Sequence, residues 1–145
     1  MFSLAAQRLT GRRKHAAILL SNGKVLVPGV SDNRDWRGEY SSAEVYDPAR
    51  GTFAAAGSMG SARFKIPEAV ALLKEGRVLI ARGTSFPEVY DNSDATFSRA
   101  DGSLEASRFF ASVTLLPSGE ALITGGYADI HRGLPSTSSA WLYRP

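Results

Sequence analysis

The chain has 145 residues, of which 43% are hydrophobic and 21% are charged. This composition is ordinary for a folded domain and excludes extensive disorder. The 17 Lys and Arg against 14 Asp and Glu favour an acidic partner, but the excess is too small for a nucleic-acid interface. Because the chain has no cysteine, the composition excludes a disulfide framework, a thiolate metal site and a cysteine nucleophile.

The first twenty residues do not follow a signal-peptide pattern, because basic residues interrupt every apolar run. These residues are Arg8, Arg12, Arg13 and Lys14. The sequence also has no apolar span of 18 residues, so no membrane segment or membrane partner is expected. We therefore expect a soluble chain without an export signal, and its compartment stays open.

In chain order, the first predicted element is a short strand over residues 1–6. Residues 15–20 and 24–27 then form two strands around a tight turn at Gly23. A third strand is predicted over residues 43–47, and a fourth around Phe53. Helix is not expected, because no apolar stripe with a 3.6-residue period continues through ten residues without Gly or Pro.

The same order of elements returns twice along the chain. Gly76 and Gly119 stand where Gly23 stands in the first hairpin, and each supplies the positive φ that a short hairpin turn requires. Third strands recur at residues 87–91 and 139–143. Fourth strands recur less completely: Phe97 marks one, and residues 1–6 supply the other at the opposite end of the chain.

Four short strands in a repeat of about 40 to 50 residues are typical of a β-propeller blade. If the strands of a blade are called a to d, the chain is predicted to read d-abcd-abcd-abc. The predicted unit covers residues 1–145 as three four-stranded blades. Its parts are strand d at 1–6, repeat one at 12–57, repeat two at 63–101 and repeat three at 108–145.

The residues within each repeat resemble those of a known family. A basic residue precedes each hairpin, a glycine pair such as Gly125-Gly126 follows it, and a phrase such as Val45-Tyr46-Asp47-Pro48 comes next. This pattern resembles kelch repeats over the whole chain, especially bacterial kelch repeats and the propeller domain of galactose oxidase-like proteins. The glycine pair becomes Gly29-Val30 in repeat one and Arg82-Gly83 in repeat two, and Phe stands where many kelch repeats carry Trp.

The resemblance implies a ring of blades, and three blades are fewer than the four to eight of known propellers. Kelch propellers close by pairing a strand from one terminus with three strands from the other. We therefore expect two copies to join head to tail as a six-bladed homodimer, in which residues 1–6 of each copy complete the third blade of its partner. The alternative is a fragment of a larger propeller.

Candidate ligand-binding residues lie on the face that carries the long loops between strands b and c. Arg12, Lys65 and Arg108 each stand eleven residues before a hairpin glycine, which predicts a basic ring at the channel mouth. Such a ring would attract an anionic ligand, or it would only bond backbone carbonyls of neighbouring blades. The loops add further charged and stacking candidates, namely Arg34, Trp36, Arg37, Tyr40, Tyr127, Asp129, His131 and Arg132.

Other repeated side chains are predicted to have structural roles. The tyrosines of the third strands and the phenylalanines of the fourth strands should be core residues. Asp47 and Asp91 should cap the turn between strands c and d. His15 should be a packed or hydrogen-bonded residue of the first strand rather than a ligand. The residues predicted to lie in the core are Tyr46, Tyr90, Tyr143, Phe2, Phe53 and Phe97.

No catalytic residue, metal site or cofactor is predicted. Copper-radical oxidation of the galactose oxidase kind would need a cysteine cross-linked to tyrosine and paired histidines, whereas the chain has no Cys and two His, His15 and His131. A glycosidase would need two facing carboxylates, and nothing in the spacing of Asp32, Asp35, Glu68 and Asp129 singles out a pair.

The sequence favours a non-enzymatic propeller unit that binds a protein, peptide or carbohydrate, including an anionic carbohydrate, through its loop-rich basic face. No nucleic-acid partner is expected. Two alternatives stay open: a carbohydrate-active hydrolase or lyase with its site at the channel mouth, and a purely structural propeller fragment.

Overall fold

The computed structural model describes residues 1–32, 38–63, 66, 68–128 and 136–145. Within these residues the chain forms strands and turns without any helix, so no helix of the described chain could cross a membrane. The strands are β1 (Ile18–Leu19), β2 (Val25–Ser31), β3 (Glu39–Asp47), β4 (Thr52–Arg63), β5 (Val70–Leu72), β6 (Val78–Ile80), β7 (Glu88–Asp91), β8 (Thr96–Arg99), β9 (Ser112–Leu115), β10 (Ala121–Thr124) and β11 (Ala140–Tyr143).

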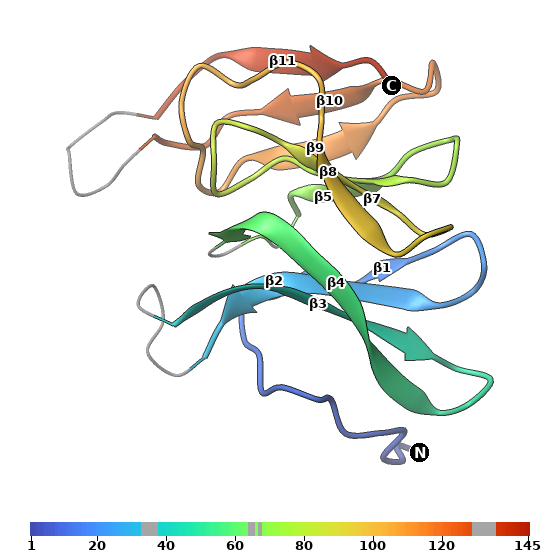
Figure 1. Ribbon diagram of the computed structural model, residues 1–145. Helices are drawn as coiled ribbons and strands as arrows, with labels where there is room; N and C mark the ends of the chain where they lie inside the picture. Colours follow the sequence, from blue (N-terminus) through green and yellow to red (C-terminus); the bar gives the residue numbers. More distant parts are fainter. Residues whose placement is uncertain (33–37, 64–65, 67, 129–135) are drawn as a thin grey trace.

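The strands form three antiparallel sheets that are stacked one on another (Figure 1). The first sheet has the order β1-β2-β3-β4, the second β5-β6-β7-β8, and the third β11-β10-β9. Neighbouring strands are consecutive in sequence, and the predicted hairpin glycines Gly23, Gly76 and Gly119 have φ of 81°, 93° and 98°. The predicted all-β fold and its two four-stranded and one three-stranded groups of hairpin-linked strands are confirmed.

The register across the strands is the same in each sheet. Val25 pairs with Tyr46, which pairs with Phe53, and Val78 pairs with Tyr90, which pairs with Phe97. The Tyr and Phe rings therefore pack side by side, with centroids 5.0 Å apart in the first sheet and 4.8 Å apart in the second.

The two faces of each sheet carry different side chains because neighbours along a strand point in opposite directions. We call one the tyrosine face, after Tyr46, Tyr90 and Tyr143, and the other the leucine face, after Leu26, Leu79 and Leu122. The tyrosine face of the second sheet packs on the leucine face of the first, and the tyrosine face of the third packs on the leucine face of the second.

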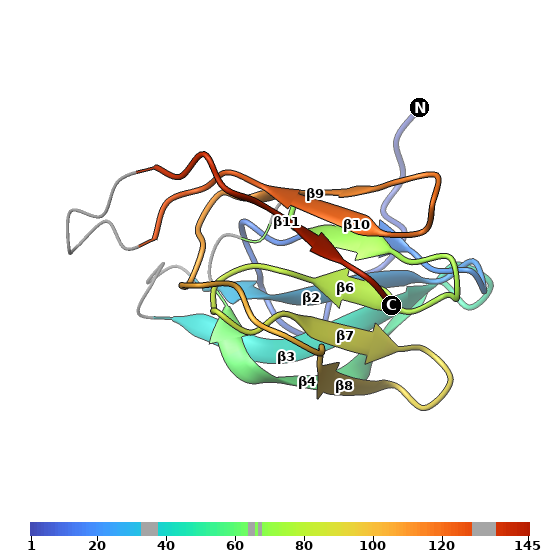
Figure 2. The ribbon, with the colours of Figure 1, turned by 90° about the horizontal axis from the view of Figure 1, so that it is seen from above.

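The middle sheet is therefore buried on both faces. Val78 and Ile80 of β6 pack toward the first sheet, whereas Leu79 between them packs toward the third, and all three side chains are fully buried. This explains why β6 is an uninterrupted apolar run. Contacts of β4 with β8 and of β5 with both β1 and β9 join the layers, and the view from above shows the sheets overlying one another (Figure 2).

Within the described part of the chain, one face at each end of the stack has no sheet packed on it. These are the tyrosine face of the first sheet, where Leu19 is exposed and Tyr46 half-buried, and the leucine face of the third sheet, where Leu142 is exposed. Leu19 is the repeat equivalent of Leu72, and Leu142 of Val89, both of which pack between sheets.

The prediction that residues 1–6 complete a blade of a second copy, with Phe2 in its core, stays a prediction. Within the chain these residues form no strand, and the Phe2 side chain is fully exposed. The physical reason is that the first sheet already has four strands. Instead, the segment runs past the first sheet toward the N-terminus, as the blue trace in Figure 1 shows. The other predicted core aromatics are buried or half-buried.

Shortening Ile80 should reveal how strongly the double-sided burial of β6 stabilises the fold. We expect Ile80→Ala to lower the free energy of unfolding by about 2 to 5 kcal/mol, and Ile80→Val by about 0.5 to 1.5 kcal/mol, because the removed atoms leave a cavity between two sheets. Urea unfolding followed by circular dichroism measures both values. Equal losses below about 0.5 kcal/mol for both variants would show that β6 is not in a packed core.

Candidate functional site

The candidate site lies along the edge where β1, β5 and β9 begin and where β2, β6 and β10 end. We call this the arginine edge, because Arg12, Arg63 and Arg108 are buried there, each ahead of the first strand of a sheet. The opposite edge carries the three hairpin glycines. Isolated bridges hold the chain at the arginine edge, joining Arg13 to Ser31 and Phe109 to Tyr127.

Arg12 is bonded to its own sheet. Its Nε lies 3.0 Å from Oε1 of Glu44, and its two terminal nitrogens donate to the carbonyl oxygens of Gly29 and Ser42 and to the Ser42 hydroxyl. The two charged side chains are only 1% and 2% exposed. The Tyr40 ring lies over the guanidinium at 5.1 Å. These contacts favour the structural role that the sequence left open for Arg12.

Glu44 also holds the N-terminal segment. The backbone amides of Leu9 and Thr10 donate to its carboxylate oxygens at 3.2 Å and 3.0 Å. Arg8 adds a hydrogen bond to the Arg12 carbonyl oxygen. One buried carboxylate therefore fixes both the arginine and the chain that precedes it.

Arg63 repeats this arrangement in the second sheet. Its Nη2 donates to Oε1 of Glu88 at 2.7 Å and to the Phe86 carbonyl oxygen at 3.0 Å, and Nη1 donates to the carbonyl oxygen of Arg82. Glu88 also accepts a hydrogen bond from the Gly60 amide. Burial lowers the pKa of Arg63, and the neighbouring Glu88 opposes that shift, so the guanidinium keeps its charge at neutral pH.

The sequence predicts that Lys65 is equivalent to Arg12. In the structure, Arg63 occupies the equivalent buried position instead. Between Arg63 and Ala69 the chain has two more residues than between Arg12 and Ala16. Counting back from the hairpin glycine therefore lands on Lys65, which lies outside the described residues.

Arg108 occupies the third of these positions with different neighbours. Its guanidinium lies 5.0 Å from the centre of the Trp141 ring. Its ion pair in the described chain joins Nη2 to Glu105 at 3.9 Å, and the Glu105 side chain is 75% exposed. Nε of Arg108 is buried and has no hydrogen-bond partner in that part of the chain.

Aromatic side chains and a fourth arginine extend the arginine edge between the second and third sheets. Arg82 is buried with its guanidinium 4.3 Å from the Phe110 ring, and Phe110 in turn packs against Tyr127 with ring centres 5.5 Å apart. Burial lowers the pKa of Arg82 to about 10, so it stays charged at neutral pH. Phe110 is half exposed, which leaves an aromatic surface in solvent.

The structure thus brings four of the predicted site residues to one edge: Arg12, Tyr40, Arg108 and Tyr127. It does not test whether they bind a ligand. The remaining predicted site residues lie outside the described residues, namely Arg34, Trp36, Arg37, Lys65, Asp129, His131 and Arg132.

Sequence reasoning missed Glu44 and Glu88, the carboxylates that pair with the arginines. A signal was present, because Glu precedes Val-Tyr-Asp in both of the first two repeats. The exposed aromatic side chain of Phe110 was also missed, because the residues next to it in the sequence do not indicate that it is exposed.

Two structural predictions are confirmed near the sheets. Asp47 accepts hydrogen bonds from the amides of Ala49 and Arg50, and Asp91 from that of Ser93, so both cap their turns. His15 is hydrogen-bonded as predicted, with Nη1 of Arg8 3.2 Å from Nε2 and 3.3 Å from Nδ1, although it precedes β1 and is not part of the strand.

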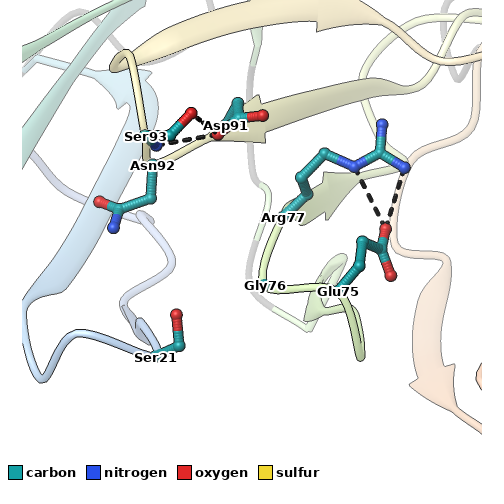
Figure 3. A pocket seen from close by; sticks show the side chains of 7 residues that line it. All are labelled: Ser21, Glu75, Gly76, Arg77, Asp91, Asn92 and Ser93. Carbon is teal, nitrogen blue, oxygen red and sulfur yellow. Dashed lines mark hydrogen bonds and ion pairs between the residues drawn. The ribbon is translucent and has the colours of Figure 1, made fainter.

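A surface hollow of about 400 Å³ lies at the opposite, hairpin edge (Figure 3). Its polar side chains bond one another: Arg77 pairs with Glu75 at 3.0 Å, and Asp91 accepts hydrogen bonds from Ser93. These internal bonds leave few groups to recognise a ligand, so we place the candidate site at the arginine edge. The lining residues are Ser21, Glu75, Gly76, Arg77, Asp91, Asn92 and Ser93.

Comparison with known proteins supports the fold. No family model and no curated protein matches the chain. A solved structure of a fungal alcohol oxidase of the AA5 family, in complex with copper, is similar over 92% of this chain with a TM-score of 0.68 and 17% sequence identity. The chain spans 28% of the length of that structure. At this identity the likeness shows the fold alone, a β-rich galactose oxidase-like fold.

The copper of that oxidase does not fit the residues present in this chain. The chain has no Cys and two His, and the described residues contain no group of three His, Cys, Asp or Glu side chains that could hold a metal ion.

Neutralising Glu44 should weaken the fold and release the N-terminal segment. We expect Glu44→Gln to lower the free energy of unfolding by about 3 to 5 kcal/mol, because it leaves the Arg12 charge buried without a carboxylate. Trypsin should also cut faster at Arg8. Glu120→Gln, at a partly exposed pair with Arg144, is the control and should cost less than about 1 kcal/mol. If the two variants have the same stability and cleavage rate, the buried pair does not anchor this segment.

Lowering the pH should weaken the fold through His15. Burial, with the charges of Arg8 and Arg12, holds the pKa of His15 below its ordinary value of 6.5. The unfolded chain therefore takes up the proton first, so this stabilisation is complete above about pH 6.5 and is lost as the pH falls toward the folded pKa. In His131→Gln, where His15 is the remaining histidine, the free energy of unfolding measured with urea should decrease as the pH falls from 7.5 to 5.5. His15→Gln in that background should flatten it, and an unchanged decline would assign the effect to other groups.

Proposed function

We propose that the chain is a non-enzymatic binding unit that forms three blades of a kelch-type β-propeller and binds a protein, peptide or carbohydrate at the arginine edge. The observation that carries this proposal is the repeated packing of a tyrosine face on a leucine face, which we call a joint. Two such joints occur inside the chain, and one face of each kind is left at the ends of the stack.

The two end faces fit each other by the same chemistry that joins the inner sheets. In the inner joints, Tyr90 and Phe97 pack on a surface that includes Leu26 and Val45. The end faces offer Tyr46 and Phe53 on the first sheet, and Leu122 and Leu142 on the third, at the equivalent positions. A face of this kind is stabilised when it leaves water against a complementary one.

A second copy of the chain supplies both complementary faces at once. In a head-to-tail dimer, each leucine end face packs on the tyrosine end face of the partner, which closes a ring of six blades around a two-fold axis. The exposed N-terminal segment, with Phe2 in solvent, would then pair with the free edge of β11 in the partner and complete its sheet.

The arginine edge has the surface expected of a binding site for a polar partner. Arg13 and Lys14 are exposed there beside β1, and Phe110 is exposed beside β9. Phe86 adds a second exposed ring, with the Arg99 guanidinium 3.2 Å from its centre. Aromatic rings with neighbouring cations suit stacking on sugar rings and contacts with acidic peptides.

The buried carboxylates of this edge are not available as the hydrolytic pair of the glycosidase alternative. Glu44 and Glu88 are bonded to Arg12 and Arg63, so neither is free to act as the acid or the base of a hydrolytic pair.

Molar mass in solution tests the assembly. We expect light scattering after size-exclusion chromatography to give twice the 15.5 kDa of one chain. Leu142→Arg or Tyr46→Arg should each give a monomer, because a charge at the joint would be buried without a partner. Ser118→Arg, at an exposed turn, is the matched control and should stay dimeric. A monomeric parent chain, or dimers of all three variants, would contradict the head-to-tail ring.

A further inference from the structure

Arg108 differs from its two counterparts because, among the residues that the structure describes, no carboxylate of its own sheet pairs with it. Glu44 is paired with Val27 in the strand register, and Glu88 with Ile80. Trp141 is paired with Ile123, the repeat equivalent of Val27 and Ile80, so it holds the glutamate position in the third sheet. The third sheet has thus exchanged a carboxylate for an aromatic ring while keeping the arginine.

The exchange leaves the edge of the guanidinium available, because a ring and a carboxylate contact different parts of it. An aromatic ring stacks on the flat face, whereas the N–H groups donate within the plane. Arg12 shows both contacts together, with Tyr40 over its face at 5.1 Å and Glu44 on Nε at 3.0 Å. Arg108 has the ring contact with Trp141, and its buried Nε has no acceptor in the described chain. Nε of Arg63 also has no acceptor there, but Nη2 of Arg63 donates to Glu88, so the missing carboxylate is what distinguishes Arg108.

A buried guanidinium without an acceptor is unfavourable, since arginine keeps its charge and loses the water that solvated it. The side chain of Arg108 is 8% exposed, and Glu105 at 3.9 Å is too far for a hydrogen bond. The surroundings add positive charge, because Arg82 is buried next to Gly83, whose amide donates to the Arg108 carbonyl oxygen at 3.1 Å. The position is therefore suited to an oxyanion supplied from outside the chain.

We propose that Arg108 binds the carboxylate of a small organic acid, which takes the role that Glu44 and Glu88 have in the other two sheets. The inference rests on the proposed binding function and names its ligand chemistry. The planar carboxylate matches the fork of N–H donors, and the exposed Phe110 offers a surface for the rest of the ligand. The carboxylate could belong to an acidic sugar or to a peptide terminus.

Thermal unfolding in the presence of defined acids tests the site. Sodium D-glucuronate, sodium acetate and N-acetylglycine are compared at constant ionic strength with sodium chloride and with D-glucose. We expect a saturable rise of the unfolding midpoint with the carboxylates, because they bind the folded chain, and none with chloride or glucose. A response to glucuronate alone identifies an acidic sugar, and one to N-acetylglycine alone a peptide terminus.

Two substitutions at one position place the response at Arg108. Trp141→Glu restores the internal carboxylate and should weaken binding of the acids at least about tenfold, whereas Trp141→Gln, which has the same shape without the charge, should retain it. Arg108→Met should abolish the response. In a Trp36→Phe background, the fluorescence of Trp141 should change on titration, since its ring lies on the guanidinium.

Absence of any carboxylate response in the parent chain would overturn the inference, as would equal binding by Trp141→Glu and Trp141→Gln. These outcomes are separable from failure of the proposed function. A six-bladed dimer that binds a neutral glycan but no carboxylate contradicts this inference alone, whereas a monomer with Arg108-dependent carboxylate binding contradicts only the assembly.

Discussion

A sheet that is apolar on both faces cannot leave either face in water without a loss of stability, and the rest of this structure depends on that constraint. The second sheet meets it fully, because Val78 and Ile80 pack on one neighbour and Leu79 on the other. The first and third sheets meet it on one face each. Stacking within the chain therefore creates two end faces of opposite kind, and the head-to-tail association that we propose would cover both of them.

Burial of charge at one edge is the second organising feature. Arg12 and Arg63 join the start of a sheet to its third strand through Glu44 and Glu88, and both pairs are removed from water. Such pairs add little net stability over an apolar packing, but removing one partner is costly because it leaves the other charge buried. Arg108 breaks the pattern with Trp141, and a break in an otherwise repeated contact is a place where a ligand can act.

Much of the fold could be predicted because its signals are local. The hairpin glycines mark backbone positions with positive φ, and the spacing from Tyr46 to Phe53 and from Tyr90 to Phe97 fixes the register of two strands. The partners of the arginines could not be found in this way, because Arg12 and Glu44 are distant in sequence and meet only when the sheet forms. Two additional residues before β5 made Lys65 appear equivalent where Arg63 is buried. Phe2 fits the repeat, but the first sheet, which follows it in the chain, already has four strands, and the third sheet with its edge at β11 lies at the other end of the stack.

In the proposed ring, a tyrosine end face and a leucine end face recognise each other as the inner faces do. A crystal structure of the chain would show whether they meet in this way. We expect Leu142 of one copy to pack against Tyr46 of another, and residues 1–6 to form a strand beside the partner's β11. A structure in which like faces pair, or in which both end faces remain in solvent, would contradict it.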